Sequence, residues 1–211
     1  MRPGTSRGHA AAGVQQFGYL MAKLHVLGEF VRKPMSVGAV APSSRRLAEL
    51  ITDVAELDRA AVVIEFGPGT GAFTEVILQK IPPTAAFFAI ESNESFAAAT
   101  RTRFPGLQVV HDSAVAVRAH LEARGHASCD CIVSGLPFAS FTPAQQDAIL
   151  AAVIDVLVPG GRFVTFAHLT GIVWPLARRF RHRLTAEFSD VAVTHTIWRN
   201  IPPAYVYRAV R

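Results

Sequence analysis

The chain has 211 residues, of which 50% are hydrophobic and 18% are charged, so it can bury a sizeable core in one generous domain. No run of about 18 apolar residues is free of charges and breakers, so the sequence does not indicate a membrane span. The N-terminal segment also lacks the uninterrupted hydrophobic region of a secretory signal, because Lys23, His25 and Glu29 divide it. The net charge of +5 is unevenly spread, with five Lys or Arg against one Glu in residues 1–34, nine against thirteen acids in 35–170, and seven against two in 171–211. Two basic ends favour a polyanionic partner, either nucleic acid or an anionic lipid surface.

The N-terminal segment divides into a flexible tail and an amphipathic helix. Residues 1–13 are small, basic and interrupted by Gly and Pro, which predicts a loose tail. Residues 14–34 carry apolar side chains every three or four positions, which predicts a helix that either lies on a membrane surface or packs on the rest of the protein. We expect residues 14–211 to form one domain. The apolar stripe consists of Phe17, Leu20, Met21, Leu24, Leu27 and Val31.

From residue 61 onwards, apolar strand-like runs alternate with helix-like stretches. Strands are predicted at 61–67, 85–92, 107–113, 129–138, 161–169, 190–198 and 204–210. Helices are predicted at 72–81, 93–104, 114–125 and 142–160, and a basic stretch occupies 176–188. Continuous apolar strands that alternate with helices indicate an α/β fold with a doubly wound, mostly parallel sheet of seven strands.

A polar residue ends each of the first four predicted strands. These residues are Glu65, Glu91, Asp112 and Ser134, with spacings of 26, 21 and 22 residues. Right-handed crossovers bring the carboxyl ends of such strands to one edge of the sheet, where ligands of doubly wound folds bind. We therefore expect the four side chains to converge on one crevice.

The glycine-rich stretch "EFGPGTG" at residues 65–71 lies between the first predicted strand and helix. A phosphate-binding P-loop would need a Lys after Gly71, and the dinucleotide pattern GxGxxG fits poorly. The stretch resembles motif I, E-x-G-x-G-x-G, of the class I S-adenosylmethionine-dependent methyltransferases, a Rossmann-like family, and residues 61–170 follow that family's order of strands and helices.

The resemblance implies S-adenosylmethionine as cofactor and gives the strand ends their roles. Glu91 would accept the ribose hydroxyls, Asp112 with Ser113 would hold the adenine, and Glu65 would orient the α-ammonium group. The alternative interpretation is that these acids are only helix caps or surface residues and do not bind the cofactor. No metal is expected, since Cys129 and Cys131 are interpreted as buried hydrophobes. The remaining expected cofactor residues are Val40, Ser43, Gly67, Gly69, Thr70, Gly71, Ser92 and Ser134.

The fourth predicted strand ends in "SGLPF", which resembles the NLPY motif of rRNA adenine-N6 dimethylases. Gly135 stands where that family has Asn, and without the amide a planar amino group loses its main contact. Backbone carbonyls of Gly135 or Leu136 and the ring face of Phe138 suit a compact amine that becomes a permanent cation. We expect these three residues, with Tyr19, to form the catalytic side of the site.

Together with "VGAVAPSS" at 37–44 and "IPPA" at 201–204, this motif is similar to the bacterial phospholipid N-methyltransferases that are related to rRNA dimethylases. The likeness runs from about residue 17 to 211, and Ser43 or Ser44 is expected to cap the helix that follows. It implies stepwise methylation of phosphatidylethanolamine towards phosphatidylcholine by a cytoplasmic protein bound to the inner face of the membrane. Related enzymes methylate ornithine lipids. The alternatives are an rRNA or other nucleic-acid adenine methyltransferase, with nucleic acid the less favoured partner, and a membrane-surface module without activity.

The remaining polar residues are assigned to the lipid substrate. Tyr19, His168 and Tyr205 are candidates for accepting the proton of the amine, because no His–Asp pair at a strand end stands out. An arginine cluster at 178–183 could bind anionic lipid. The oligomeric state stays open. Candidates for the lipid phosphate are Arg45, Arg199, Asn200 and the pair Tyr205 and Tyr207.

Overall fold

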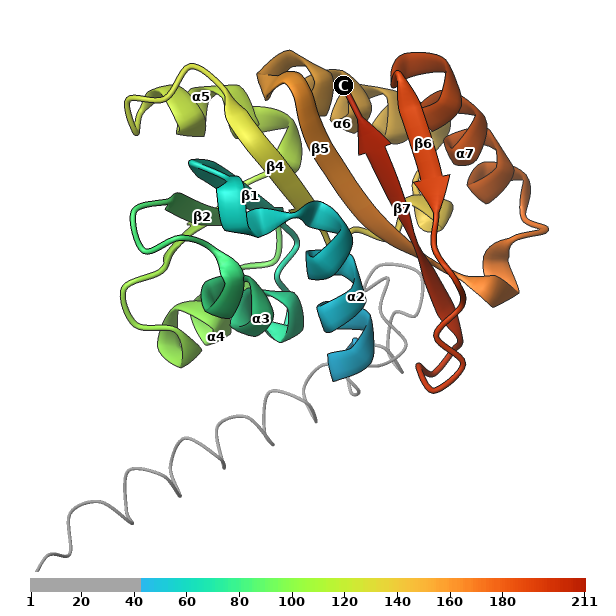
Figure 1. Ribbon diagram of the computed structural model, residues 1–211, viewed down its shortest axis with the longest axis horizontal. Coiled ribbons are helices and arrows are strands. Elements are labelled where there is room, and N and C mark those ends of the chain that lie inside the picture. Colours follow the sequence, from blue (N-terminus) through green and yellow to red (C-terminus); the bar gives the residue numbers. More distant parts are fainter. Residues whose placement is uncertain (1–42) are drawn as a thin grey trace, which may run out of the picture.

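The computed structural model describes residues 43–211, which form one sheet with helices on both faces (Figure 1). The strands are β1 (Val62–Phe66), β2 (Ala86–Glu91), β3 (Gln108–His111), β4 (Cys129–Ser134), β5 (Leu157–His168), β6 (Asp190–Val193) and β7 (Ala204–Val210). The helices are α2 (Arg45–Ala55), α3 (Ala72–Lys80), α4 (Glu94–Arg103), α5 (Val117–Glu122), α6 (Pro143–Val156) and α7 (Pro175–Glu187). Short 3-10 turns are η1 (Leu57–Arg59), η2 (Ala114–Ala116), η3 (Phe138–Ser140) and η4 (Leu169–Gly171).

The sheet has the strand order β3-β2-β1-β4-β5-β7-β6. Strands β1 to β5 are parallel to one another, and β7 lies antiparallel between β5 and β6. The order reverses between β1 and β4, which places the crevice of a doubly wound fold at their carboxyl ends. The predicted α/β fold with seven mostly parallel strands is confirmed.

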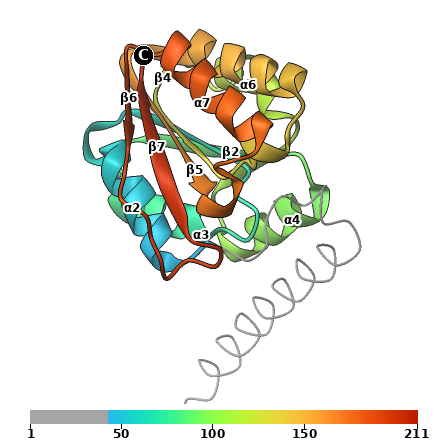
Figure 2. The same ribbon diagram turned by 90° about the vertical axis from the view of Figure 1, so that its right-hand side faces the viewer.

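Each face of the sheet packs against its own set of helices. Neighbouring β1 residues point to opposite sides, so that Val63 packs with Ile77 of α3 and Ile64 packs with Leu150 of α6. Figure 2 shows α6 and α7 on one side of the sheet and α2 and α3 on the other. Because both faces are covered, all five residues of β1 are buried, and the strand end is held rigidly beneath the site.

Local signals explain several helix ends. Ser44, one of the two predicted caps, begins α2 and accepts a hydrogen bond from Leu47 N–H. Thr142 and Gln145 form a reciprocal capping box at the start of α6. These side chains satisfy N–H groups that the first turn leaves unpaired.

Several predicted boundaries differ from the structure. The strand predicted at 129–138 ends at Ser134, and the helix predicted at 114–125 is the turn η2 followed by α5, which ends at Glu122. The helix predicted to reach residue 160 ends at Val156, because Leu157 is already extended and pairs with Cys129 of β4. The strand predicted at 190–198 ends at Val193, and only an isolated bridge from Ile197 to Ala204 continues it. The basic stretch at 176–188 is helix α7 for nearly its whole length.

The predicted tail 1–13, the amphipathic helix 14–34, Tyr19 and Val40 lie outside the described residues. None of the helices within residues 43–211 is long and apolar enough to cross a membrane.

Candidate active site

The carboxyl ends of β1 to β4 lie side by side, as predicted. Backbone hydrogen bonds also join the residues that follow each strand to the neighbouring strand, and these bonds fix the relative positions of the strand ends. Gly67 N–H donates to Ile90 O (2.8 Å), Asp112 N–H to Glu91 O (3.1 Å) and Gly135 N–H to Phe66 O (2.7 Å). The strand ends therefore form one continuous edge.

The glycine loop after β1 is fixed by its own backbone conformation and by two side chains of α4. Gly67 and Gly71 have φ angles of 66° and 79°, in the left-handed region that favours glycine. Thr100 Oγ1 donates to Gly69 O (2.9 Å), and the Arg103 guanidinium donates to Thr70 O (2.5 Å). Two side chains of α4 thus fix the position of the glycine loop.

Glu91 joins the end of β2 to the glycine loop. One carboxylate oxygen accepts from Gly69 N–H (3.1 Å) and the other from Asn93 N–H (3.0 Å). Burial raises the pKa of Glu91, while these N–H groups oppose the rise. Ser92 beside it is exposed, and its carbonyl lies 3.1 Å from His111 Nε2. Each carboxylate oxygen of Glu91 keeps further acceptor capacity for ligand hydroxyls.

Glu65 is completely buried at the end of β1. One of its oxygens accepts from Thr74 Oγ1 (2.6 Å), and the other, Oε1, has no hydrogen-bond partner among the described residues. Burial raises the pKa of Glu65 to about 8, although the bond from Thr74 opposes the shift. A buried carboxyl oxygen without a partner is a place where a cationic donor would be stabilising.

Asp112 directly follows β3 and pairs with a histidine. Its carboxylate accepts from Ser113 N–H (2.7 Å) and lies 2.7 Å from His120 Nε2 of α5. The hydrogen bond with His120 is the main reason that the pKa of Asp112 is lowered. Ser113 also caps η2 through Val115 N–H. No His–Asp pair stands out in the sequence, because Asp112 follows β3 and His120 lies on α5, but the fold brings the two side chains together.

The segment from Ser134 to Phe138 lies directly against the glycine loop. Ser134 is fully buried, and its hydroxyl accepts from Leu136 N–H (3.3 Å). A Cβ built on Gly135 would lie 2.5 Å from Gly67 O, which is closer than real Cβ contacts. Gly135 is therefore required by the close approach of two backbones, whatever ligand binds there.

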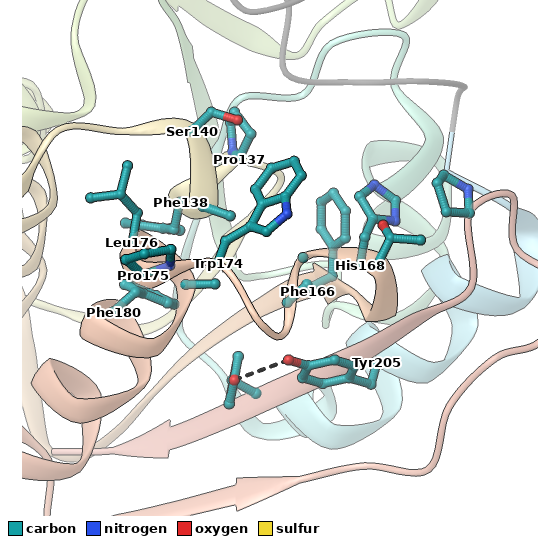
Figure 3. A pocket seen from close by; sticks show the side chains of 17 residues that line it. Pro137, Phe138, Ser140, Phe166, His168, Trp174, Pro175, Leu176, Phe180 and Tyr205 are labelled. Atoms are coloured by element: carbon teal, nitrogen blue, oxygen red, sulfur yellow. Dashed lines mark hydrogen bonds between the residues drawn. The ribbon is translucent and has the colours of Figure 1, made fainter.

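A cavity of about 580 Å³ opens beyond this segment (Figure 3). It lies between η3, the end of β5, the turn that leads into α7, and β7, and most of its lining is aromatic or aliphatic. The aromatic and polar side chains that matter below are Phe138, Phe166, His168, Trp174, Tyr205 and Tyr207. The cavity begins where the strand edge ends, so the two parts adjoin.

Phe138 forms part of the cavity wall but is largely committed to the core. Its ring stacks on Phe180 with centroids 4.1 Å apart and planes at 15°, and meets Phe141 and Phe163 edge to face. Only 3% of the residue is exposed. Gln146 of α6 fixes its backbone by donating to Phe138 O (2.8 Å). The stacking on Phe180 occupies one ring face that the sequence analysis assigned to a cation.

Two tyrosines and a histidine supply polar groups in the cavity. The hydroxyls of Tyr205 and Tyr207 lie 3.2 Å apart, and both residues are buried. Burial is the main cause that raises the pKa of Tyr207. His168 lies edge-on to Phe166, and its Nδ1 has no hydrogen-bond partner among the described residues. Burial lowers the pKa of His168, which keeps the imidazole neutral at pH 7.

Comparison with known proteins agrees with this geometry. Residues 64–163 match the methyltransferase-domain family. The chain is similar to the ornithine lipid N-methyltransferase of Singulisphaera acidiphila, with 31% identity over 184 residues that cover 86% of this chain and 92% of the relative. The chain belongs to the S-adenosylmethionine-dependent methyltransferases. It is also 30% identical, over 56% of its length, to ribosomal RNA small subunit methyltransferase A of Streptococcus agalactiae, of which it covers 40%.

Solved structures place this methyltransferase in the same fold. The O-methyltransferase TomG of Streptomyces achromogenes, solved with S-adenosylmethionine, has a TM-score of 0.65 and 20% identity, and the match covers 92% of this chain and 89% of TomG. The N-methyltransferase NodS of Bradyrhizobium japonicum, solved with S-adenosylhomocysteine, has a TM-score of 0.60 and 14% identity, over 79% and 86% of the two chains. The methyltransferase uses S-adenosylmethionine. Among residues 43–211, no group of three metal-ligating side chains was found.

Asn200 has a different position from the one expected. Its Oδ1 accepts from Ser44 N–H (3.0 Å), its Nδ2 donates to Pro202 O (2.7 Å), and only 4% of it is exposed. The buried amide already holds two backbone groups, which argues against the expectation that Asn200 assists a lipid phosphate. It ties the start of α2 to the loop before β7. Ser43, which precedes this contact, is half-buried.

The arginines differ in how far they are already paired. Arg45 is exposed and bonded to Glu49 (2.9 Å), and Arg199 is exposed. In the α7 cluster, Arg179 and Arg183 both reach Asp147 of α6, at 2.6 and 3.0 Å. The expectation that all four arginines are available to lipid is thus corrected, since two of them hold α7 against α6.

Proposed function

We propose that this methyltransferase methylates the amine of a membrane lipid head group. Phosphatidylethanolamine, converted stepwise towards phosphatidylcholine, is the head group that the resemblance to phospholipid N-methyltransferases implies. Ornithine lipid is the second candidate, favoured by the similarity to the Singulisphaera acidiphila enzyme. Both substrates combine a primary amine with a long apolar body, and both fit an apolar cavity beside the cofactor edge.

The observation that carries the proposal is the connection between the strand edge and the cavity. Residues 134–138 touch the glycine loop at one end and begin the cavity wall at the other. An amine held near Gly135 or Leu136 would therefore have its apolar part among the aromatic side chains. A cavity with few polar groups favours such a substrate over a free, fully hydrated amine.

The strand-edge residues suit the chemistry of the cofactor. S-adenosylmethionine supplies, when bound, a methyl group activated by its sulfonium. Glu91 would hold the ribose diol, Asp112 with Ser113 the adenine, and the unpartnered oxygen of Glu65 the ammonium. The glycine loop, which contains Gly67, Gly69, Thr70 and Gly71, would let the cofactor approach the backbone closely. In this proposal the cofactor site also includes Ser43, Ser92 and Ser134.

The cavity residues must present the amine without its extra proton. His168 is neutral and lines the cavity, and its Nδ1 has no hydrogen-bond partner within residues 43–211, so it would accept that proton. The Tyr205 and Tyr207 hydroxyls would bind oxygen atoms of the head group. Carbonyl groups of Gly135 and Leu136 would orient the amine, and the remaining edge of Phe138 would line its path.

The charged part of the head group would lie at the cavity mouth. Within the described residues, no Lys or Arg lines the cavity itself, so anion binding is left to exposed cations such as Arg199 and Arg45. The protein would then act as a peripheral protein at the cytoplasmic face of the membrane. In this proposal the predicted amphipathic helix 14–34 contacts the membrane, and Tyr19 lines the site.

A second candidate function, adenine methylation of rRNA, is favoured by the similarity to the Streptococcus agalactiae enzyme. Its amide contact cannot be supplied at Gly135, where a side chain would collide with Gly67 O. Adenine would then lack that contact in this protein, so the lipid amine is the preferred proposal.

Mass spectrometry after incubation with methyl-labelled S-adenosylmethionine tests the proposal. The reaction would contain vesicles with phosphatidylethanolamine and ornithine lipid, together with ribosomal RNA. We expect label on one or both lipid amines, and the number of added methyl groups identifies the product. Label on adenine alone would support the second candidate and refute the first.

A further inference from the structure

The most exposed apolar side chains of the described residues lie in two loops beside the cavity. Val173 is 73% and Trp174 is 52% exposed in the turn before α7, and Trp198 is 71% and Ile201 is 76% exposed in the segment before β7. We call residues 169–174 and 194–203 the rim loops. Large apolar groups that face water in one region mark an interaction surface.

The rim loops form one surface at the cavity. Leu169 N–H donates to Pro203 O (2.8 Å), which joins the loops directly. Trp174 from one loop and Pro202 from the other line the cavity. In Figure 1 both loops lie at the same end of the sheet, where β5 ends and β7 begins. Whatever the rim loops contact would therefore be held against the cavity.

The rim loops themselves contain no Asp or Glu. The chain has no Asp or Glu between Asp155 and Glu187, and none after Asp190. Arg178 lies one helical turn after Trp174, to whose carbonyl its N–H donates (3.1 Å), and Arg199 follows Trp198. Both arginines are exposed, and neither has an ion pair within residues 43–211. An apolar surface flanked by unpaired cations is complementary to an anionic partner that also accepts apolar groups.

We propose that the rim loops insert into the interface of an anionic bilayer and hold the cavity at the level of the lipid head groups. Trp side chains prefer that interface, and each nearby cation adds attraction to anionic lipid. The surface would let a lipid enter the cavity without crossing water. The delivery of lipid to the cavity rests on the proposed function. Membrane binding by the rim loops does not, because it requires no methyl transfer.

Flotation of the full chain with vesicles of phosphatidylcholine and phosphatidylglycerol tests the contact, because these vesicles contain no amine substrate. The double variant Val173→Ser/Trp198→Ser removes two exposed side chains that do not line the cavity. We expect its apparent affinity for vesicles to fall at least about tenfold. The matched control Leu78→Ser/Val193→Ser changes similarly apolar groups, 43% and 47% exposed, outside the rim loops and should float like the wild type.

Two further readouts separate the contact from the chemistry. Arg178→Gln should weaken binding to vesicles that contain phosphatidylglycerol and leave binding to pure phosphatidylcholine vesicles unchanged. With a short-chain aminolipid dissolved as monomers, the double variant should keep methyl transfer within about twofold of the wild type. A wild type that floats but methylates no lipid would refute the proposed function and leave the membrane contact standing.

Unchanged flotation of the double variant would overturn the inference. So would a wild type that fails to float but self-associates through the rim loops, with the double variant monomeric, since the partner would then be a second copy of the chain.

Discussion

Gly135 and Gly67 pack so closely that a Cβ on Gly135 would lie 2.5 Å from Gly67 O. Gly135→Asn, which would restore the amide of adenine dimethylases, should therefore not create adenine methylation. We expect it to lower both the melting temperature and the affinity for S-adenosylhomocysteine, because the glycine loop must move. Calorimetry and thermal unfolding measure the two effects.

Gly125→Ala is the matched control, because a Cβ there meets nothing within 4 Å while the φ of 77° still imposes strain. It should cost about 1–2 kcal/mol of stability without a specific loss of cofactor affinity. A stable Gly135→Asn protein with unchanged cofactor affinity would contradict the steric explanation.

This pair also illustrates what the sequence could and could not predict. The alternation of apolar runs with Gly and Pro breaks was enough to predict β1 to β5 and the convergence of Glu65, Glu91 and Asp112. It did not reveal that Gly135 is dictated by Gly67, since the two are far apart in the sequence. In the sequence alone, the missing side chain at Gly135 suggests a choice of substrate, whereas its close approach to Gly67 O explains the glycine without any ligand.

Contacts between distant elements account for the other differences. Thr100 and Arg103 hold the glycine loop from α4, but nothing in their local pattern distinguishes them from surface residues of a helix. His120 reaches Asp112 only because η2 and α5 turn back towards β3. The pairing of Arg179 with Asp147 likewise depends on how α7 packs on α6. Periodicity reports which residues are buried, but it does not report partners across the fold.

The raised pKa of Glu65 predicts an unusual dependence of stability on pH. The folded protein holds this proton up to about pH 8, whereas an unfolded chain releases it near the ordinary value of 4.5. The contribution of Glu65 is therefore most favourable below the unfolded pKa and is lost as pH rises through about 8. Urea unfolding across this window should show stability falling with pH, and Glu65→Gln should flatten that slope.

Saturation with S-adenosylhomocysteine should also flatten the slope, because an ammonium beside Glu65 would stabilise the carboxylate. A slope that persists unchanged in Glu65→Gln would mean that another group is responsible.

Phe138 is expected to serve both packing and activity. Its stacking on Phe180 means that Phe138→Ala would cost about 3–5 kcal/mol, a large share of the stability of a typical domain. Phe138→Leu keeps most of the volume and is the more informative variant. We expect it to reduce methyl transfer more than cofactor affinity, as measured by kinetics and calorimetry. Equal losses in both would argue against a role on the acceptor side.

His168 is expected to accept a proton from the amine. Since burial lowers its pKa below 6.5, the wild-type rate should fall only when the pH drops through that lowered pKa. His168→Gln should slow methyl transfer by about 100-fold or more and remove this acid limb of the pH profile. If the variant changes KM or stability but keeps the limb, His168 has a positioning role instead.

The central claim, that the cavity receives the methyl acceptor, is tested most directly by filling it. Gly171 lines the cavity, and a Cβ there would meet Ala139 and Trp174 only at 3.9 Å, so Gly171→Leu adds volume without a backbone clash. The measurement is label transfer to aminolipid at saturating S-adenosylmethionine, beside calorimetric affinity for S-adenosylhomocysteine. The account predicts at least about a 30-fold loss of transfer with cofactor affinity unchanged. Full transfer by a folded Gly171→Leu protein would contradict it.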